Sequence, residues 1–245
     1  WFTAKTGGEK VTDGTAIHRD MTVYAQWTRD SLRIGEGFTA DSFKYKVIKA
    51  GQVELLGFAT SSKVKSVVIP ATITAPSTIE TYKVVSIAPN AFSNNKAITA
   101  VTIGKNVTTI EKSAFAKCTA LKTVKGAKAV KAIENNAFMG CKKLTNVSTM
   151  GKLVKIGESA FKGCSAIKKF TIGKSVTSIG KKAFYKCKRL SKIIIKSAKL
   201  KKVGNKAIAG IRKNAVLKVP SKKMSKYRKY FNAKTGYKKT MRIMK

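Results

Sequence analysis

The sequence predicts a repeat solenoid built from short parallel strands, with about 23 residues in each coil. Two observations lead to this fold class: phenylalanine recurs every 23 residues, and four further apolar columns keep step with it. A fixed period of roughly 20 to 50 residues is typical of solenoids, in which each unit buries its apolar face only against its neighbours. The phenylalanine column consists of Phe92, Phe115, Phe138, Phe161 and Phe184, and Ile208 follows 24 residues later.

Each unit contains two expected strands and one tight turn. The pattern L-x-x-V-x-I, as at 121–126, alternates apolar and polar residues and predicts a short strand. The pattern V-x-x-I, as at 107–110, predicts a second extended piece. A-F-x-x-C-x-x-L suits one helical or 3-10 turn. Stacked at about 4.8 Å per coil, the strands of six to seven coils would form a narrow parallel sheet roughly 30 Å long.

The N-terminal part departs from the repeat, as the end of a solenoid is expected to. Residues 64–73 match the strand columns of a first coil, and an insertion at 76–81 delays the next coil. Further upstream, residues 43–58 alternate around Gly51. This pattern predicts a β-hairpin that caps the open edge of the first coil.

The C-terminal segment also differs from the repeat. After Pro220, four apolar and aromatic residues share one face of an expected helix, namely Met224, Tyr227, Tyr230 and Phe231. Such a face between lysines suits nucleic acid or a membrane surface, or it covers the last coil. We favour the cap.

Charge is extreme and uneven, with a net value of +40. Residues 1–81 hold 10 basic and 8 acidic residues, whereas residues 82–245 hold 41 basic and 3 acidic ones. No carboxylate side chain follows Glu158. Such a field attracts polyanions over a Debye length of about 8 Å at physiological salt. Only 7 of the 51 basic residues are arginine, so the charge is diffuse rather than arranged for bidentate readout of bases or phosphates.

Units of the form V-T-x-I-G-x-x-A-F-x-x-C-x-x-L resemble the BspA-type leucine-rich repeat of bacterial surface proteins. The best matches are 107–121 and 176–190, and the resemblance covers about 64–220. The closing VPSKKMSKYRKYFNAKTGYKK is similar to tails of such proteins in gut Firmicutes. The opening WFTAKTGGEKVTDGTAIHRDMTVYAQW is similar to the latter half of the Listeria–Bacteroides repeat, the small β-domain of the internalin B-repeat region.

Together, the repeat and the resemblances predict the domain organisation. The five segments are a partial Listeria–Bacteroides-type β repeat at 1–28, a linker at 29–42, a capping hairpin with the first coil and insertion at 43–81, the leucine-rich repeats at 82–220, and a basic cap at 221–245. Both resemblances imply an exported protein, on the cell surface or secreted. No apolar run approaches the roughly 18 residues of a membrane span. Because the chain opens on Trp1, we interpret it as a fragment.

Four cysteines are the most conspicuous candidate for a metal or disulfide site. Cys118, Cys141, Cys164 and Cys187 are spaced by the repeat period and therefore occupy one structural column. No C-x-x-C pair accompanies them, and the single histidine lies far upstream, which argues against zinc. Buried, reduced thiols are the favoured interpretation, with a disulfide or a metal as alternatives. We expect no cofactor and no metal.

Two glutamates, Glu111 and Glu134, sit one coil apart, and Glu158 follows one position out of register. Carboxylates roughly 5 Å apart would suit a retaining glycosidase. The simpler interpretation is that they are counter-charges in a lysine field, and we expect no enzyme. His18 lacks an accompanying nucleophile motif, and the glycines around Glu36 lack the spacing of a phosphate-binding loop.

The outward positions of the first strand are the candidate binding surface, because exposed sheet faces carry the ligand sites of many solenoids. The alternative is a solvated face without a ligand. These positions become more basic toward the C-terminus. The candidate residues are Thr123, Lys125, Asn146, Ser148, Lys169, Thr171, Lys192 and Ile194.

Two functions from different classes remain. The first is a non-enzymatic, adhesin-like binding module that presents a basic face to a host matrix protein, an anionic glycan or teichoic acid of its own wall. Many weak lysine contacts would provide avidity and strong salt dependence. The second is a structural spacer whose charge serves only retention in the wall. A nucleic-acid partner is disfavoured, because no recognition motif or stacking platform supports it.

Overall fold

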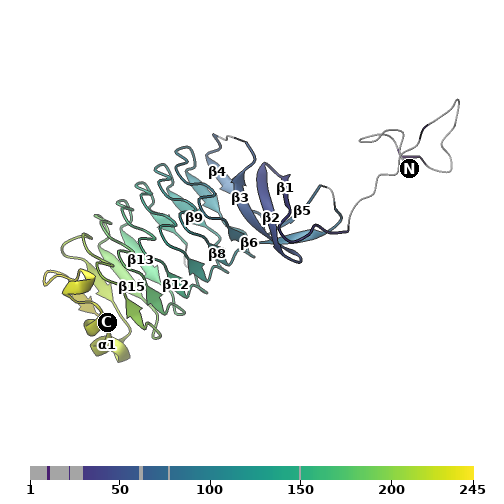
Figure 1. Ribbon diagram of the computed structural model, residues 1–245. Coiled ribbons are helices and arrows are strands. Elements are labelled where there is room, and N and C mark those ends of the chain that lie inside the picture. The colour runs from purple at the N-terminus through teal and green to yellow at the C-terminus, as the bar shows by residue number, and fades with distance from the viewer. Residues whose placement is uncertain (1–9, 12–21, 23–29, 61–62, 77, 149) are drawn as a thin grey trace.

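The structure is a computed structural model that describes residues 10–11, 22, 30–60, 63–76, 78–148 and 150–245. Its repeats stack into an elongated rod, with a β-hairpin at one end and a short helix at the other (Figure 1). The predicted solenoid fold and its 23-residue coils are therefore confirmed. The predicted β repeat at 1–28 lies almost entirely outside the described residues and stays a prediction.

One side of the rod is a ten-stranded sheet. Its parallel part comes from the V-x-x-I pattern, because the isoleucine points inward while the preceding residue faces outward. These strands are β6 (Thr81–Ile87), β8 (Thr109–Ile110), β10 (Ala132–Ile133), β12 (Lys155–Ile156), β14 (Ser178–Ile179) and β16 (Lys202–Val203).

The N-terminal hairpin extends this sheet instead of only covering it. Strand β3 pairs with β6 in parallel and with β2 in antiparallel orientation around the turn at Gly51. Strand β1 then pairs with β2, so part of the predicted linker at 29–42 is wrong: four of its residues form a strand. The added strands are β1 (Gly37–Ala40), β2 (Phe43–Lys49), β3 (Gln52–Phe58) and β5 (Thr72–Thr74).

The other strand-bearing side carries the L-x-x-V-x-I pattern, and here the single expected sheet is split in two. The first sheet contains β4 (Ser66–Val68), β7 (Ala100–Thr102), β9 (Thr123–Lys125) and β11 (Asn146–Val147). The second contains β13 (Lys169–Ile172), β15 (Lys192–Ile195), β17 (Val216–Lys218) and β18 (Arg242–Met244). Among the described residues, no strand pairing joins β11 to β13.

The split coincides with a change of side chain in the buried column. Valine fills this column at Val101, Val124 and Val147, whereas β13 places Phe170 there. The Phe170 ring packs edge-on against Phe161 and Phe184, with ring centroids 5.0 and 4.8 Å apart. An aromatic ring needs more room than a valine, and interiors are packed too tightly to absorb the difference without a shift. We attribute the interrupted pairing to this ring.

The A-F-x-x-C segment forms the third side of each coil. Successive i to i−3 hydrogen bonds make it a chain of tight turns rather than the single helical or 3-10 turn expected from the sequence. Two residues per coil with positive φ, for example Ser113 and Lys117, prevent the turn from continuing as a helix. Each turn also bonds laterally: the Phe115 N–H donates to the Ala137 carbonyl at 2.8 Å.

The phenylalanine column forms the centre of the core. The stacked rings of Phe92, Phe115, Phe138, Phe161 and Phe184 lie with centroids 5.2 to 5.5 Å apart. Burial of each ring contributes about 2 to 3 kcal/mol, and each aromatic pair adds about 0.5 to 1.5 kcal/mol. The column therefore ties together the five coils from Phe92 to Phe184.

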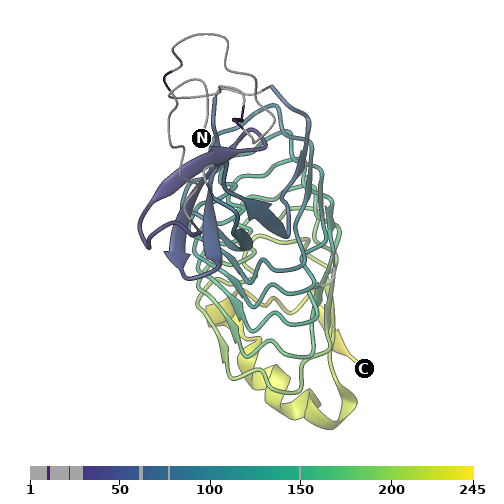
Figure 2. The same ribbon diagram turned by 90° about the vertical axis from the view of Figure 1, so that its right-hand side faces the viewer.

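The C-terminal segment closes the last coil, at the end of the rod seen in Figure 2. It comprises η1 (Ser221–Lys223), α1 (Met224–Tyr230), η2 (Ala233–Thr235) and strand β18. Tyr227 and Phe231 are buried, and the Tyr227 hydroxyl donates to the Ser197 carbonyl. The Ile208 N–H donates to the Thr235 carbonyl at 3.0 Å, which extends the lateral bonds of the turns into the cap.

Candidate functional site

The structure places the eight predicted surface residues on the side of the rod that is split. Strands β9 and β11 carry Thr123, Lys125 and Asn146. The remaining strand residues lie on β13 and on β15, which pairs with it. Lys169 lies beside Lys192, and Thr171 lies beside Ile194. The candidate residues therefore form two groups, one on each sheet, with Ser148 at the break between them.

Ser148 follows β11 and differs from the other candidates. It is half-buried, and its hydroxyl oxygen lies inside the protein without a hydrogen-bond partner among the described residues. A buried hydroxyl without a partner destabilises the folded state by about 1 to 3 kcal/mol. Ser148 is thus a packing feature of the break and not a free surface residue.

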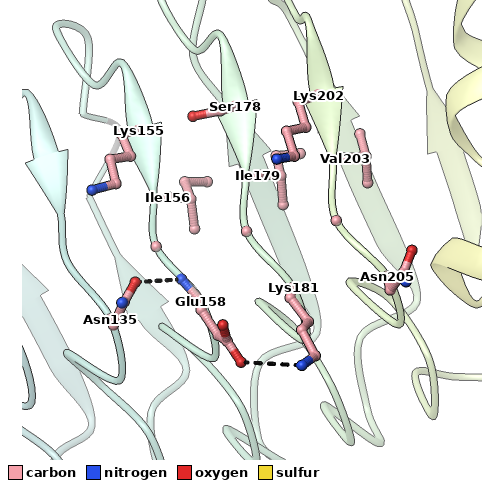
Figure 3. A pocket seen from close by; sticks show the side chains of 13 residues that line it. Asn135, Lys155, Ile156, Glu158, Ser178, Ile179, Lys181, Lys202, Val203 and Asn205 are labelled. Carbon is pink, nitrogen blue, oxygen red and sulfur yellow. Dashed lines mark hydrogen bonds and ion pairs between the residues drawn. The ribbon is translucent and has the colours of Figure 1, made fainter.

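A groove of about 510 Å³ lies on the opposite side, where β12, β14 and β16 lead into the turns (Figure 3). Gly157, Gly180 and Gly204 line it directly after these strands. A Cβ atom on any of them would come within 2.4 to 2.6 Å of the backbone of the preceding coil. Glycine is therefore required for the coils to approach closely here.

Charged residues at this groove form short interactions between coils. Lys155 Nζ lies 2.8 and 3.0 Å from the two carboxylate oxygens of Glu134. Glu158 approaches Lys181 Nζ at 4.0 Å, and its N–H donates to Asn135 Oδ1 at 2.8 Å (Figure 3). The carboxylates at the groove are consequently engaged by lysines, and additional lysines such as Lys202 leave the groove basic.

The glutamate pair supports the counter-charge interpretation. Burial, and then the neighbouring carboxylates of Glu134 and Glu54, raise the pKa of Glu111. Glu134 itself is held by Lys155, which occupies both of its oxygens. Within the part of the chain that the structure describes, nothing positively indicates catalysis.

The cysteines are buried and free, as the repeat spacing predicts. Each thiol donates to the carbonyl of the phenylalanine in the preceding coil, for example from Cys141 Sγ to Phe115 O at 3.1 Å. Burial raises the pKa of Cys118 and Cys187 to about 12 and also raises the pKa of Cys164. The column is therefore a row of inert core thiols that bond one coil to the next.

His18 lies outside the described residues. Gly35 has a φ of +96° in a turn that bonds to Val47, which fits a structural position. Among the described residues, no group of three or more potential metal ligands gathers, and no helix is long and apolar enough to cross a membrane.

Sequence reasoning missed the groove of Figure 3. The signal was present in the residue that follows the isoleucine column. In successive units it reads Ala88, Glu111 and Glu134, and then changes to glycine in three units in a row, Gly157, Gly180 and Gly204. Loss of a side chain at one repeat position marks a place where neighbouring backbones approach.

Comparisons with known proteins agree with this geometry. A sequence profile of the BspA-type leucine-rich repeat region matches residues 57–187 and 85–214, with six copies. A leucine-rich repeat protein from Bacteroides ovatus is similar in structure, at 26% identity and a TM-score of 0.57, over 75% of this chain and 59% of that one. No curated protein matched the sequence.

Two further solved structures share the fold. A leucine rich cell surface protein from Faecalibacterium prausnitzii has 21% identity and a TM-score of 0.56, over 76% of this chain and 65% of that one. The leucine-rich repeat protein of T. pallidum has 19% identity and a TM-score of 0.60, over 83% of this chain and 100% of that one. The chain spans less than two thirds of the length of the first two proteins.

Proposed function

Because the chain belongs to the BspA-type leucine-rich repeat family, we propose that it is a non-enzymatic binding module of a bacterial surface or secreted protein. Its basic solenoid surface would hold an anionic partner. The relative from Faecalibacterium prausnitzii, described as a cell surface protein, supports an extracellular location. The candidate partners are a host matrix protein, an anionic glycan and teichoic acid of the cell's own wall.

One observation carries the proposal: the lysine field of the repeats is almost without internal compensation. Residues 82–245 contain 41 basic and 3 acidic residues, and two of the three carboxylates lie within 4.0 Å of a lysine. Such a field weakens the folded state through self-repulsion. A bound polyanion would relieve that repulsion, so affinity would come from many weak contacts.

The experiment that tests this function is retention of the chain on immobilised ligands at about 0.05 and 0.5 M NaCl, concentrations that bracket physiological screening. The panel contains heparin, mucin, fibronectin, fibrinogen, teichoic acid and duplex DNA. Retention of one ligand at high salt supports specific binding. Failure to retain any ligand at either salt concentration contradicts a binding role.

A second candidate is a structural spacer, and the continuous ten-stranded sheet favours it because it makes the rod stiff. In that case the charge would serve general retention in the wall. Lys169→Glu with Lys192→Glu would then reduce retention no more than Lys222→Glu with Lys223→Glu in the cap. A larger loss from the first pair supports specific contact on β13 and β15 and contradicts the spacer.

A further inference from the structure

A trough of about 460 Å³ runs along the turn side of the rod, away from the predicted binding strands. We call it the turn-face trough. Its walls come from five consecutive coils, and its middle is lowered by two glycines. The lining residues are Asn94, Lys96, Lys117, Thr119, Met139, Gly140, Lys142, Lys162, Gly163 and Lys186.

Each of the five coils contributes one lysine to the trough. In chain order these are Lys96, Lys117, Lys142, Lys162 and Lys186. They come from three different positions within the repeat, yet each coil supplies one lysine to the lining. None of the ten lining residues is acidic. The trough therefore presents positive charges at the axial step of the solenoid, about 4.8 Å per coil.

Two of the trough lysines have a left-handed backbone conformation, as do Lys182 and Lys206 outside the trough. Lys117 and Lys186 have φ of 58° and 59°, a region that glycine and asparagine occupy at lower cost. The equivalent positions in the two coils between them are Gly140 and Gly163, with φ of 74° and 73°. At this repeat position, lysine stands in the two outer coils and glycine in the two coils between them, which lowers the middle of the trough.

The floor does not suit an added peptide strand. Its amide groups already bond to the next coil: the Lys117 N–H donates to the Met139 carbonyl, and the Gly140 N–H donates to the Lys162 carbonyl, at 2.6 and 2.7 Å. Strand addition needs free main-chain groups at a sheet edge. What remains is a floor of Met139, the glycine Cα atoms and the lysine stems. The Lys186 ammonium lies over the ring of Tyr185, 5.4 Å from its centroid, so a ligand would have to compete with that contact.

We infer that the turn-face trough binds an acidic polysaccharide that carries a carboxylate on every sugar. Its C–H faces would lie on the apolar floor, and its carboxylates would meet the five ammonium groups. One coil is about 4.8 Å long, roughly the length of one pyranose unit, so a chain along the rod offers one carboxylate for each coil. Its carboxylates project to different sides of the chain, and the lysines that would meet them come from three different positions within the repeat. This inference rests on the proposed function, names a ligand class for it, and places that ligand on the turns instead of on β13 and β15.

The test measures binding of the full chain to oligogalacturonates of two to eight sugars at 0.15 M NaCl by calorimetry. We expect affinity to increase with each sugar up to about five and then to level off, because five coils supply lysines. Two further ligands test whether the spacing of the carboxylates matters. They are hyaluronan oligosaccharides, which carry a carboxylate on every second sugar, and a glutamate peptide of equal charge. We expect both to bind at least fivefold more weakly.

Variants matched in charge then locate the site. Lys117→Glu with Lys162→Glu should weaken binding of the octamer at least tenfold. Lys222→Glu with Lys223→Glu in the cap changes the net charge equally and should weaken it less than threefold. Far-UV circular dichroism and thermal melts confirm that both proteins are folded.

Several results would overturn the inference. If the two variants lose equal affinity for the octamer, the charge acts without a specific site. If hyaluronan or the peptide binds as tightly as oligogalacturonate, a carboxylate on every sugar is not required. Absence of oligogalacturonate binding would also overturn it. The proposed function is decided separately, because retention of teichoic acid or a matrix protein on the panel would stand even if the trough bound no sugar.

Discussion

The two strand-bearing sides of the rod use the same repeat but differ in continuity. On one side, a single sheet runs from β1 to β16, and its inward column from Ile87 of β6 to Val203 of β16 is isoleucine or valine. On the other side, pairing stops between β11 and β13, beside Phe170. Both sides share the phenylalanine column of the turns. The comparison teaches that a solenoid tolerates a misfit on one side when its other two sides remain bonded.

The largest effect is expected where all coils depend on one column. Phe138→Ala removes a fully buried ring that stacks on Phe115 and Phe161 at 5.3 Å on each side. We expect a loss of about 3 to 5 kcal/mol in the free energy of unfolding, measured by urea denaturation. A loss below about 1 kcal/mol would show that the column does not hold the coils together.

A smaller effect is expected at the break. Phe170→Val places at this position the residue type of Val124 and Val147. The variant loses the buried area of the ring, but we expect β11 and β13 to pair, which offsets part of that loss. We expect a loss of about 1 to 2 kcal/mol by the same measurement. Hydrogen exchange should then show added protection at β11 and β13. If protection does not change, the Phe170 ring is not the cause of the split.

The cysteine column provides a prediction about pH. The pKa of Cys118 and Cys187 is raised to about 12 from an ordinary value of 9.0, so the folded protein favours the neutral thiol. This contribution to stability is complete below about pH 9 and is lost as pH rises from about 9 to 12, because the unfolded chain loses these protons first. At pH 8, a thiol reagent should label the four cysteines only after denaturation.

The smallest effect concerns Glu111, whose pKa is raised chiefly by burial and next by Glu134. At neutral pH its charged form is disfavoured in the folded state, so Glu111→Gln should stabilise the protein by less than about 0.5 kcal/mol after screening. The gain should disappear as pH falls through the folded pKa toward the unfolded value near 4.5. Glu134→Gln is the contrasting control. It removes the ion pair with Lys155, so we expect it not to stabilise the protein.

Most of the repeat fold follows from the spacing of Phe92 to Phe184, because one period fixes which residues stack. The interrupted sheet does not follow, since a phenylalanine in a valine column does not by itself reveal whether pairing survives. Strand β1 lies in the range predicted as a linker because GFTA has no long alternation. The turn-face trough could not be predicted from one column, because its lysines come from three.

The split also has a mechanical consequence. Each coil of a solenoid touches only its neighbours, so a pulling force passes through every junction in series. Among the described residues, the junction between β11 and β13 is strand-paired on one strand-bearing side only, whereas the adjacent junctions are paired on both. A rod stretched under flow should therefore yield there first, separating into an N-terminal and a C-terminal block while the coils within each block stay stacked.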